Sequence, residues 1–218
     1  MVKKTVGWQF TVYLSDDYAI RVKHDYSQAR KRISGYLQKK GRSAEEIDKE
    51  TRQTLANIDL SWDIIKNSNC PPELIANIKQ LDEKRFRQDL AINLPTKIKP
   101  LLEKQQYKSI ERILNDFVEA NLTLWRHGIY ESTYKLDSYG YIDNIMALID
   151  PFELCNDIDF IREQLKAPDW RRICQRYRYP ARLENYIEQV AKKCLSLVNF
   201  EKIWETKKDF RLVKGGLI

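Results

Sequence analysis

The chain has 218 residues, of which 43% are hydrophobic and 11% aromatic, so it can bury a sizeable core and wholesale disorder is excluded. Lys and Arg number 38 against 31 Asp and Glu, and the net charge of +7 favours an acidic partner such as a nucleotide, nucleic acid or anionic membrane. No apolar run approaches the ~20 residues of a membrane helix, and no secretory signal follows the N-terminus. We therefore expect a soluble, cytoplasmic protein without a membrane partner. The four scattered cysteines favour reduced thiols over a zinc site.

The N-terminal segment predicts a β-hairpin. Hydrophobic and polar residues alternate over residues 6–13, which places three apolar side chains on one face: Trp8, Phe10 and Val12. The turn cluster Ser15-Asp16-Asp17 separates this strand from a second one over residues 18–23.

Helix signals follow the hairpin. Ser27 is a candidate N-cap for a helix that runs to about Lys40, with Gly41 just beyond its C-terminus. Ser43-Ala44-Glu45-Glu46 is a capping box, and the apolar spacing behind it predicts a long amphipathic helix to about residue 65.

The middle of the chain predicts short strands between residues 81 and 94. Their expected buried positions are Phe86, Leu90 and Ile92. Pro95 and Pro100 then bracket a segment that we expect to be a connector rather than a helix.

The second half is mainly helical. A helix is expected over residues 109–127, and two strands around the turn Asp143-Asn144 predict a hairpin over 139–149. Further helices are expected at 156–166 and 181–198. Strands first and helices later favour an α+β arrangement.

Several motifs, taken in order, resemble those of a protein kinase. Gly7-Trp8-Gln9-Phe10-Thr11-Val12-Tyr13 resembles the end of the glycine-rich loop, and Ile20-Arg21-Val22-Lys23 resembles Val-Ala-Ile-Lys. Residues 127–150 resemble the catalytic loop, hairpin and metal-binding Asp. More narrowly, Gly-Trp-Gln-Phe, Leu-Asp-Ser-Tyr-Gly-Tyr and Leu-Ile-Asp look like a group of small bacterial kinase-like proteins.

The resemblance implies a two-lobed, kinase-like α+β fold, with an N-lobe over residues 1–93 and a C-lobe over 94–218. It also implies an ATP site formed by Gly7, Val12, Lys23 and Asp150, with the nucleotide lying between Lys23 and Asp150. Mg²⁺ would be held by Asp150 and Ser138. Glu50 is the expected acidic partner of Lys23 on the long helix.

The catalytic motifs depart from the kinase pattern. Thr133 falls at the position of the catalytic Asp, Lys135 on the loop lysine and Ser138 on the metal-binding Asn. A threonine hydroxyl cannot act as a base at neutral pH, although Glu131 or Asp137 could supply a displaced one. Phe10 replaces the third loop glycine and Pro151 follows Asp150, so either residue could obstruct nucleotide binding.

Simpler explanations exist for the same residues. Lys23 could be a solvated lysine at a sheet edge, and Asp150 could open an ordinary turn. The segment 170–182 carries five arginines among three aromatic residues and could bind nucleic acid. Its arginines could instead pair with acidic neighbours, which is the explanation we favour, and the candidates are Asp157, Asp159, Glu163 and Glu184.

These observations favour a degenerate, nucleotide-binding pseudokinase that acts as a regulatory module and has a protein partner. The first alternative is an active, atypical ATP-dependent phosphotransferase. The second is a nucleic-acid-binding module that uses the segment Arg171–Arg182.

Overall fold

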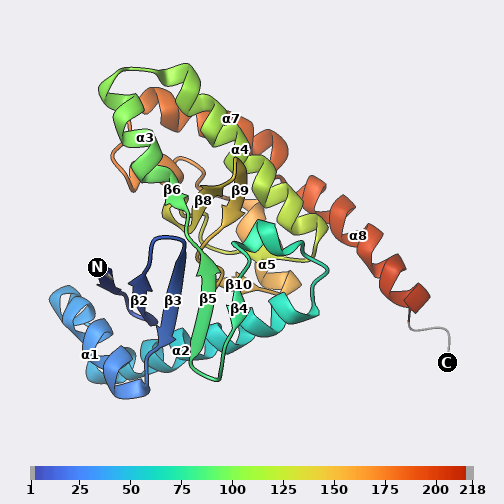
Figure 1. Ribbon diagram of the computed structural model, residues 1–218. Helices are drawn as coiled ribbons and strands as arrows, with labels where there is room; N and C mark the ends of the chain where they lie inside the picture. The colour runs from blue at the N-terminus through green and yellow to red at the C-terminus, as the bar shows by residue number, and fades with distance from the viewer. Residues whose placement is uncertain (1–2, 215–218) are drawn as a thin grey trace.

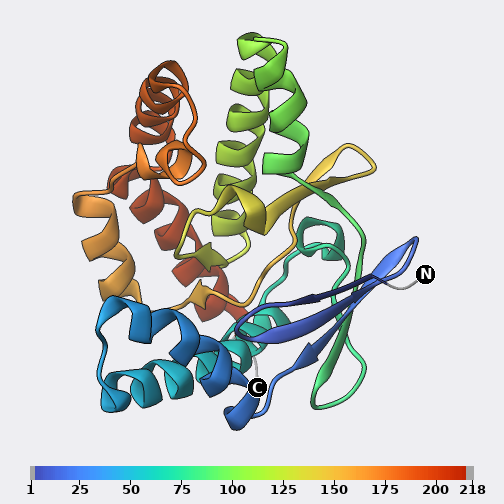
Figure 2. The same ribbon diagram turned by 90° about the vertical axis from the view of Figure 1, so that its left-hand side faces the viewer.

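The computed structural model describes residues 3–214, and it describes side chains as far as Glu205. An N-terminal part combines a sheet with α1 (Tyr26–Leu37) and α2 (Ala44–Asn67), and a mainly helical part follows it (Figures 1 and 2). The expected boundary at 93/94 falls between β6 (Ile92–Asn93) and α3 (Leu94–Glu103).

The N-terminal sheet has five antiparallel strands in the order β1-β2-β3-β5-β4. The strands are β1 (Lys3–Val6), β2 (Phe10–Leu14), β3 (Tyr18–Lys23), β4 (Lys79–Gln80) and β5 (Arg85–Asp89). The predicted hairpin is confirmed as β2 and β3. Its first strand begins at Phe10 rather than at Val6, because the chain reverses at residues 7–9. There the Gly7 N–H donates to the Phe10 carbonyl at 2.9 Å and closes a tight turn.

Both predicted helices of the N-terminal part are confirmed, but one cap differs. Asp25, rather than Ser27, caps α1, because its carboxylate accepts the Gln28 N–H and the Gln28 side chain returns to the Asp25 N–H. A 3₁₀ turn extends the helix to Lys40. Gly41 follows it with a φ of 71°, a left-handed conformation that favours glycine. The Ser43–Glu46 capping box at the start of α2 is present as predicted.

The expected burial around β5 is only partly correct. Phe86 is buried, whereas Leu90 is 38% and Ile92 is 61% exposed. The strand alternates, so Phe86 and Gln88 point inward. Because β5 ends at Asp89, the next apolar residues leave the sheet before the alternation can bury them.

The prediction of a connector around the two prolines is wrong, since both lie inside α3. Pro95 occupies the first turn, where a helix does not use its N–H groups, and Asn93 caps that end by accepting the Thr96 N–H at 3.0 Å. Pro100 costs one backbone hydrogen bond but lies near the end of a short helix.

The C-terminal part contains two small sheets among helices. The hairpin of β8 (Tyr139–Ile142) and β9 (Ile145–Leu148) is confirmed, and both turn residues have positive φ. The sheets have the orders β6-β8-β9 and β10-β7. The remaining elements are α4 (Tyr107–Arg126), β7 (Tyr130–Glu131), β10 (Leu154–Cys155), α5 (Ile158–Lys166), α6 (Arg172–Gln175), α7 (Ala181–Cys194) and α8 (Leu197–Lys214).

One of the predicted C-terminal helices is confirmed and another is divided. The predicted helix over 109–127 is confirmed as α4. The predicted helix over 181–198 is interrupted at Leu195-Ser196, where α7 ends and α8 begins. Over residues 3–214, no helix combines the length and hydropathy needed to cross a membrane.

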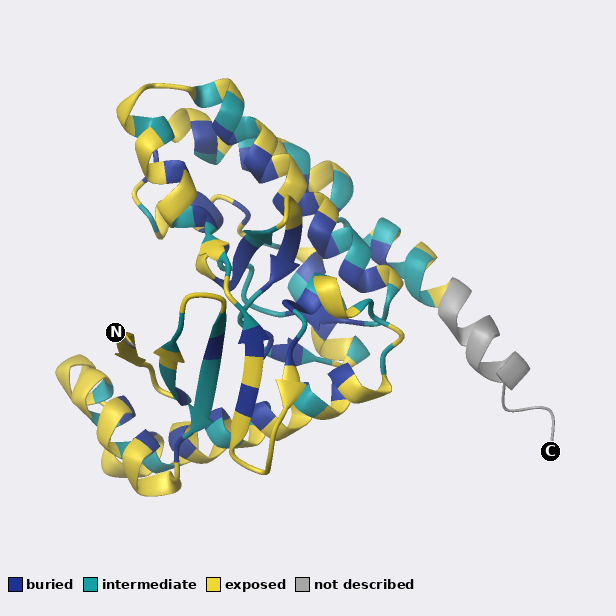
Figure 3. Cartoon of the chain, in the orientation of Figure 1, coloured by how far each residue is buried: buried dark blue, intermediate teal, exposed yellow. Residues whose placement is uncertain are grey.

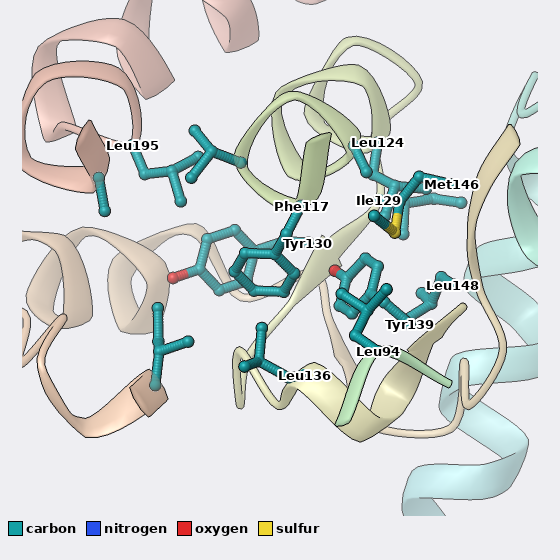
Figure 4. Close-up of a cluster of buried hydrophobic side chains, with 14 of the residues drawn as sticks. Leu94, Phe117, Leu124, Ile129, Tyr130, Leu136, Tyr139, Met146, Leu148 and Leu195 are labelled. Carbon is teal, nitrogen blue, oxygen red and sulfur yellow. The ribbon is translucent and has the colours of Figure 1, made fainter. Parts of the chain in front are cut away.

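Aliphatic and aromatic side chains pack together in the core beside the β8–β9 hairpin (Figure 4). Phe117 of α4 meets Tyr139 of β8 with ring centroids 4.8 Å apart. The buried Tyr139 hydroxyl donates to the Asn121 amide oxygen at 2.8 Å, which satisfies both polar groups inside the core. This core fixes β7 and β8, and therefore the loop that joins them.

Alanine substitutions at two glycines should change the free energy of unfolding in opposite directions. A Cβ at Gly140 would lie 2.8 Å from the Ile92 carbonyl oxygen and 3.0 Å from the Ala91 Cβ, whereas a Cβ at Gly35 meets nothing within 4 Å. We expect Gly140→Ala to lower the free energy of unfolding by about 1–3 kcal/mol through overpacking. Gly35→Ala should raise it by about 0.5–1 kcal/mol, because alanine is the better helix former. Denaturant unfolding measures both; a neutral Gly140→Ala would contradict the close pairing of β6 with β8.

Candidate functional site

Arg21 of β3 connects the N-terminal sheet to the segment that follows β9. Its Nη1 donates to the Asp150 carboxylate at 2.9 Å, and its Nη2 donates to the Ile149 carbonyl at 2.7 Å. Its Nε donates to the Gln88 amide oxygen at 2.7 Å. The Arg21 side chain is only 12% exposed, whereas the Asp150 side chain is 39% exposed. One largely buried cation therefore holds three acceptors on two segments distant in sequence.

Three phenylalanines pack beside this arginine. Phe10 and Phe86 come from the sheet, and Phe152 comes from the segment after Asp150; the Phe152 ring centroid lies 4.5 Å from that of Phe10 and 5.1 Å from that of Phe86. The Arg21 guanidinium carbon lies 5.7 Å from the ring centroids of Phe10 and Phe152. Phe10 is therefore a core residue here, and Phe152, just after Pro151, anchors the segment against the sheet.

Lys23 contacts a different acid from the one predicted. Its ammonium lies 2.6 Å from the Asp59 carboxylate of α2. The expected partner Glu50 is wrong, because it lies about two and a half turns earlier on that helix, nearer its capped end. The Asp150 carboxylate pairs with Arg21 rather than with Lys23.

Side-chain contacts hold the turn that contains Gly7. The Gln9 amide donates to the Phe152 carbonyl at 3.3 Å, and the His24 ring lies 3.0 Å from the Trp8 carbonyl. Val12 lies on β2, in register with Arg21 of β3. The turn is thus fixed both to β3 and to the segment after Asp150.

The β7–β8 loop holds the residue at the position of the kinase base. Thr133 donates its hydroxyl to the Glu131 carboxylate, which also accepts the Thr133 N–H at 2.9 Å and the Tyr134 N–H at 2.5 Å. Glu131 is 1% exposed. Burial raises its pKa to about 7, against the lowering effect of the hydrogen bonds from Thr133 and Tyr134.

The rest of the loop braces Asp150. The Ser138 carbonyl accepts the N–H groups of Ile149 and Asp150, at 2.7 and 3.2 Å. Lys135 forms an ion pair with Glu153, and Asp137 accepts the Tyr177 hydroxyl at 2.8 Å. The structure therefore places Ser138 against Asp150 through the backbone and engages Lys135 away from it.

A cavity of about 320 Å³ borders the loop, and Thr133 is one of its lining residues. Trp170, Arg172 and Arg176 also line it. The cavity therefore brings basic side chains near the loop that carries Thr133.

Two of the five arginines in the arginine-rich segment form ion pairs within the protein. Arg171 pairs with Glu188 at 2.6 Å, and Arg182 pairs with Glu111 at 2.9 Å, rather than with the four acidic residues considered from the sequence. Trp170 and Tyr179 are buried, so their rings are not available to stack on bases. The prediction of a nucleic-acid site there gains no support from this geometry.

Sequence reasoning missed Arg21 as the cation that faces Asp150. The signal was present, since Tyr18-Ala19-Ile20-Arg21 matches Val-Ala-Ile-Lys at its two middle positions. Arg21 and Lys23 lie two residues apart and so share one face of β3, and alternation alone cannot choose between them.

The sequence matches no family model and no curated protein. A solved structure of WbdD with the kinase inhibitor LY294002 is similar to this chain, with a TM-score of 0.50 and 12% sequence identity. The match covers 94% of this chain and 44% of the WbdD chain, so this protein spans less than half of that structure. The likeness shows the fold: the chain has the two-lobed, kinase-like α+β fold that the sequence predicted.

Titration of Glu131 gives a test of this site. The pKa of Glu131 in the folded chain, about 7, is above its ordinary value of 4.5, so its contribution to stability is full below pH 4.5 and is lost as the pH rises to about 7. Between pH 5 and pH 8, the wild type should lose roughly 2 kcal/mol of unfolding free energy that Glu131→Gln does not lose.

Urea unfolding at a series of pH values measures this difference. Glu83→Gln, at an exposed position, is the matched control and should follow the wild-type profile. Parallel profiles for the wild type and Glu131→Gln would contradict a carboxyl whose pKa is raised by burial.

Proposed function

We propose that this protein is a nucleotide-binding pseudokinase, a kinase-like module that binds ATP and transfers phosphate poorly or not at all. The observation that carries the proposal is the engagement of Asp150 by Arg21. In kinases the corresponding Asp binds Mg²⁺ and a lysine of the third strand binds the phosphates. Here an arginine of the third strand pairs with the carboxylate directly.

The residue at the base position supports weak transfer. Kinases use an Asp there to accept the proton of the attacking hydroxyl. Thr133 has only a neutral hydroxyl, and that hydroxyl donates to Glu131. A substrate hydroxyl placed beside Thr133 would therefore meet no free carboxylate.

The cations at the site fit the phosphates of ATP. Arg21 and Lys23 share one face of β3, and a guanidinium can hold two phosphate oxygens at once. Phosphate would compete with the carboxylate partner of each cation, so binding would loosen the contacts of Arg21 with Asp150. Gly7 and Val12 border the same face of the sheet in the proposed site.

The donor set fits Mg²⁺ less well. Asp150, with Ser138 beside it, supplies one carboxylate that is already paired with Arg21. Across the part of the chain that the structure describes, no group of three or more His, Cys, Asp or Glu side chains could hold a metal. We therefore expect Mg²⁺ to contribute less to ATP affinity than Arg21 does.

A regulatory role follows from where Arg21 lies. It joins the N-terminal sheet to the segment after β9, so a ligand that competes for it changes how firmly the two lobes are held together. A partner protein that contacts both lobes would sense that change.

Ligand-induced stabilisation tests the proposal. ATP at 100 times its Kd should raise the free energy of unfolding by about 2.7 kcal/mol. Arg21→Ala should abolish this gain, and Lys23→Ala should reduce it. Omission of Mg²⁺ should leave most of it. Thermal unfolding with and without ATP and Mg²⁺ measures these effects.

The matched control is Arg87→Ala, because Arg87 lies on β5 of the same sheet and points to the opposite, exposed face. Its response to ATP should equal that of the wild type. Absence of any shift at saturating ATP would refute nucleotide binding. Rapid phosphate transfer that Asp150→Asn abolishes would refute the pseudokinase assignment.

An active, atypical phosphotransferase is the second candidate. It is favoured by Glu131, whose pKa of about 7 suits a general base and whose carboxylate touches the Thr133 hydroxyl beside the cavity. In that case a substrate hydroxyl would pass its proton through Thr133 to Glu131. Slow ATP turnover that both Glu131→Gln and Thr133→Val abolish would establish this alternative.

A further inference from the structure

The positive charge of the chain is concentrated at its N-terminal end. Residues 1–43 contain ten Lys and Arg but only three Asp and Glu, a surplus of seven that equals the net charge of the whole chain. Residues 44–218 are therefore electrically balanced. The ten cations are Lys3, Lys4, Arg21, Lys23, Arg30, Lys31, Arg32, Lys39, Lys40 and Arg42.

Four of these cations lie on α1 and the 3₁₀ turn that follows it, and none of the four has an ion pair among the residues that the structure describes. Arg30 pairs with Asp48 and Arg42 pairs with Glu46, both on α2, whereas Arg21 and Lys23 face the site. The remaining cations of α1 and its 3₁₀ turn are exposed and have no ion pair with any residue that the structure describes. They are Lys31, Arg32, Lys39 and Lys40, here named the cationic face.

The cationic face points to solvent. All four of its residues are exposed, whereas Ala29 and Ile33 are the buried residues of α1, which packs on α2. Figure 3 shows most of α1 exposed at the edge of the molecule. Within the cationic face, Arg32 and Lys40 lie one helical turn to either side of Tyr36.

An aromatic pair lies within this group of cations. Trp8, from the turn between β1 and β2, packs on Tyr36 of α1 with ring centroids 5.3 Å apart. Trp8 is 37% and Tyr36 is 44% exposed. The Lys40 ammonium lies 4.4 Å from the centroid of the Tyr36 ring. The surface thus combines half-exposed amphipathic rings with unpaired positive charge.

We propose that the cationic face and the Trp8–Tyr36 pair dock on an anionic lipid membrane surface. Lysines and arginines on a helix are drawn to anionic headgroups, and Trp and Tyr favour the boundary between headgroups and acyl chains. This is attachment at the surface, which needs no membrane-crossing segment, and it departs from the expectation of no membrane partner. It does not depend on nucleotide binding.

Nucleic acid fits this surface less well. Sequence-independent binding of a single strand combines a basic groove with aromatic faces on which bases stack. Here Tyr36 packs on Trp8 and is covered by Lys40, so its ring is already in use. The half-exposed indole gains from burial at a lipid surface, whereas contact with phosphates alone gives it nothing.

Vesicle sedimentation tests the proposal with the full-length protein. The probes are phosphatidylcholine vesicles with and without about one third phosphatidylserine. The wild type should bind only the anionic vesicles and should dissociate at about 0.5 M NaCl, where exposed charges are screened. Trp8→Ala should weaken binding while leaving the salt dependence in place.

Two charge-matched double variants locate the surface. Lys39→Glu/Lys40→Glu changes the cationic face, and Lys104→Glu/Lys108→Glu makes the same net charge change at exposed residues around the α3–α4 connection. At about 1 kcal/mol for each lysine, the first variant should bind at least roughly 25-fold more weakly, and the second should bind about as the wild type does. Unfolding curves show whether both variants fold.

Three results would overturn the proposal. The first is no binding of the wild type to anionic vesicles at low salt. The second is equal loss in both double variants, which would show that net charge alone is responsible. The third is no vesicle binding together with tight, Lys39- and Lys40-dependent binding of a single-stranded DNA of about 20 nucleotides, which would assign the surface to nucleic acid.

Discussion

The candidate site depends on one largely buried arginine whose guanidinium is shared among three acceptors. Arg21 donates to Gln88 of the same sheet, to the Ile149 carbonyl and to the Asp150 carboxylate. A planar, permanently charged group suits this task, because several of its N–H groups can be satisfied at once in fixed directions. A lysine could replace the charge but not this geometry. The contact between the two lobes is therefore specific as well as electrostatic.

The same interaction sets the chemistry of the site. Arg21 and Lys23, the cations of the proposed phosphate site, each pair with a carboxylate. Under the proposed function, an anionic ligand would compete with these contacts, so occupancy of the site and contact between the lobes would be opposed at Arg21. An efficient transferase benefits from cations and a base that are fixed before the substrate arrives, whereas a binding module can use the competition as its response. Thr133 is a further group of the site that already has a partner within the protein, because its hydroxyl donates to the buried Glu131 carboxylate.

Local chemistry made much of the fold predictable. The Ser43–Glu46 capping box, the Asp143-Asn144 turn and the glycine after α1 each follow from hydrogen bonds or φ angles within a few residues. The errors arose where contacts between residues far apart in the sequence decide whether a residue is buried. Leu90 and Ile92 look buried by pattern, but the sheet ends before them.

The candidate site was harder to predict for the same reason. The order of the kinase-like motifs located Asp150 and the loop with Thr133, but the partner of each charge depends on how the lobes meet. Arg21 and Lys23 occupy equivalent faces of β3, and only the position of Asp150 in space distinguishes them. Glu50 and Asp59 are likewise alternatives on one long helix. Residue spacing alone does not predict whether Glu50 or Asp59 lies near the end of β3.

A double-mutant cycle of Arg21→Ala and Asp150→Ala, read as free energies of unfolding, tests the central claim most directly. Contacting residues in one hydrogen-bonded network typically couple by about 0.5–3 kcal/mol, and we expect about 1 kcal/mol or more, because the arginine is buried. The cycle of Lys23→Ala and Asp150→Ala should be additive within about 0.5 kcal/mol. Additivity in the first cycle, or stronger coupling in the second, would contradict the assignment of Arg21 as the cation that holds Asp150.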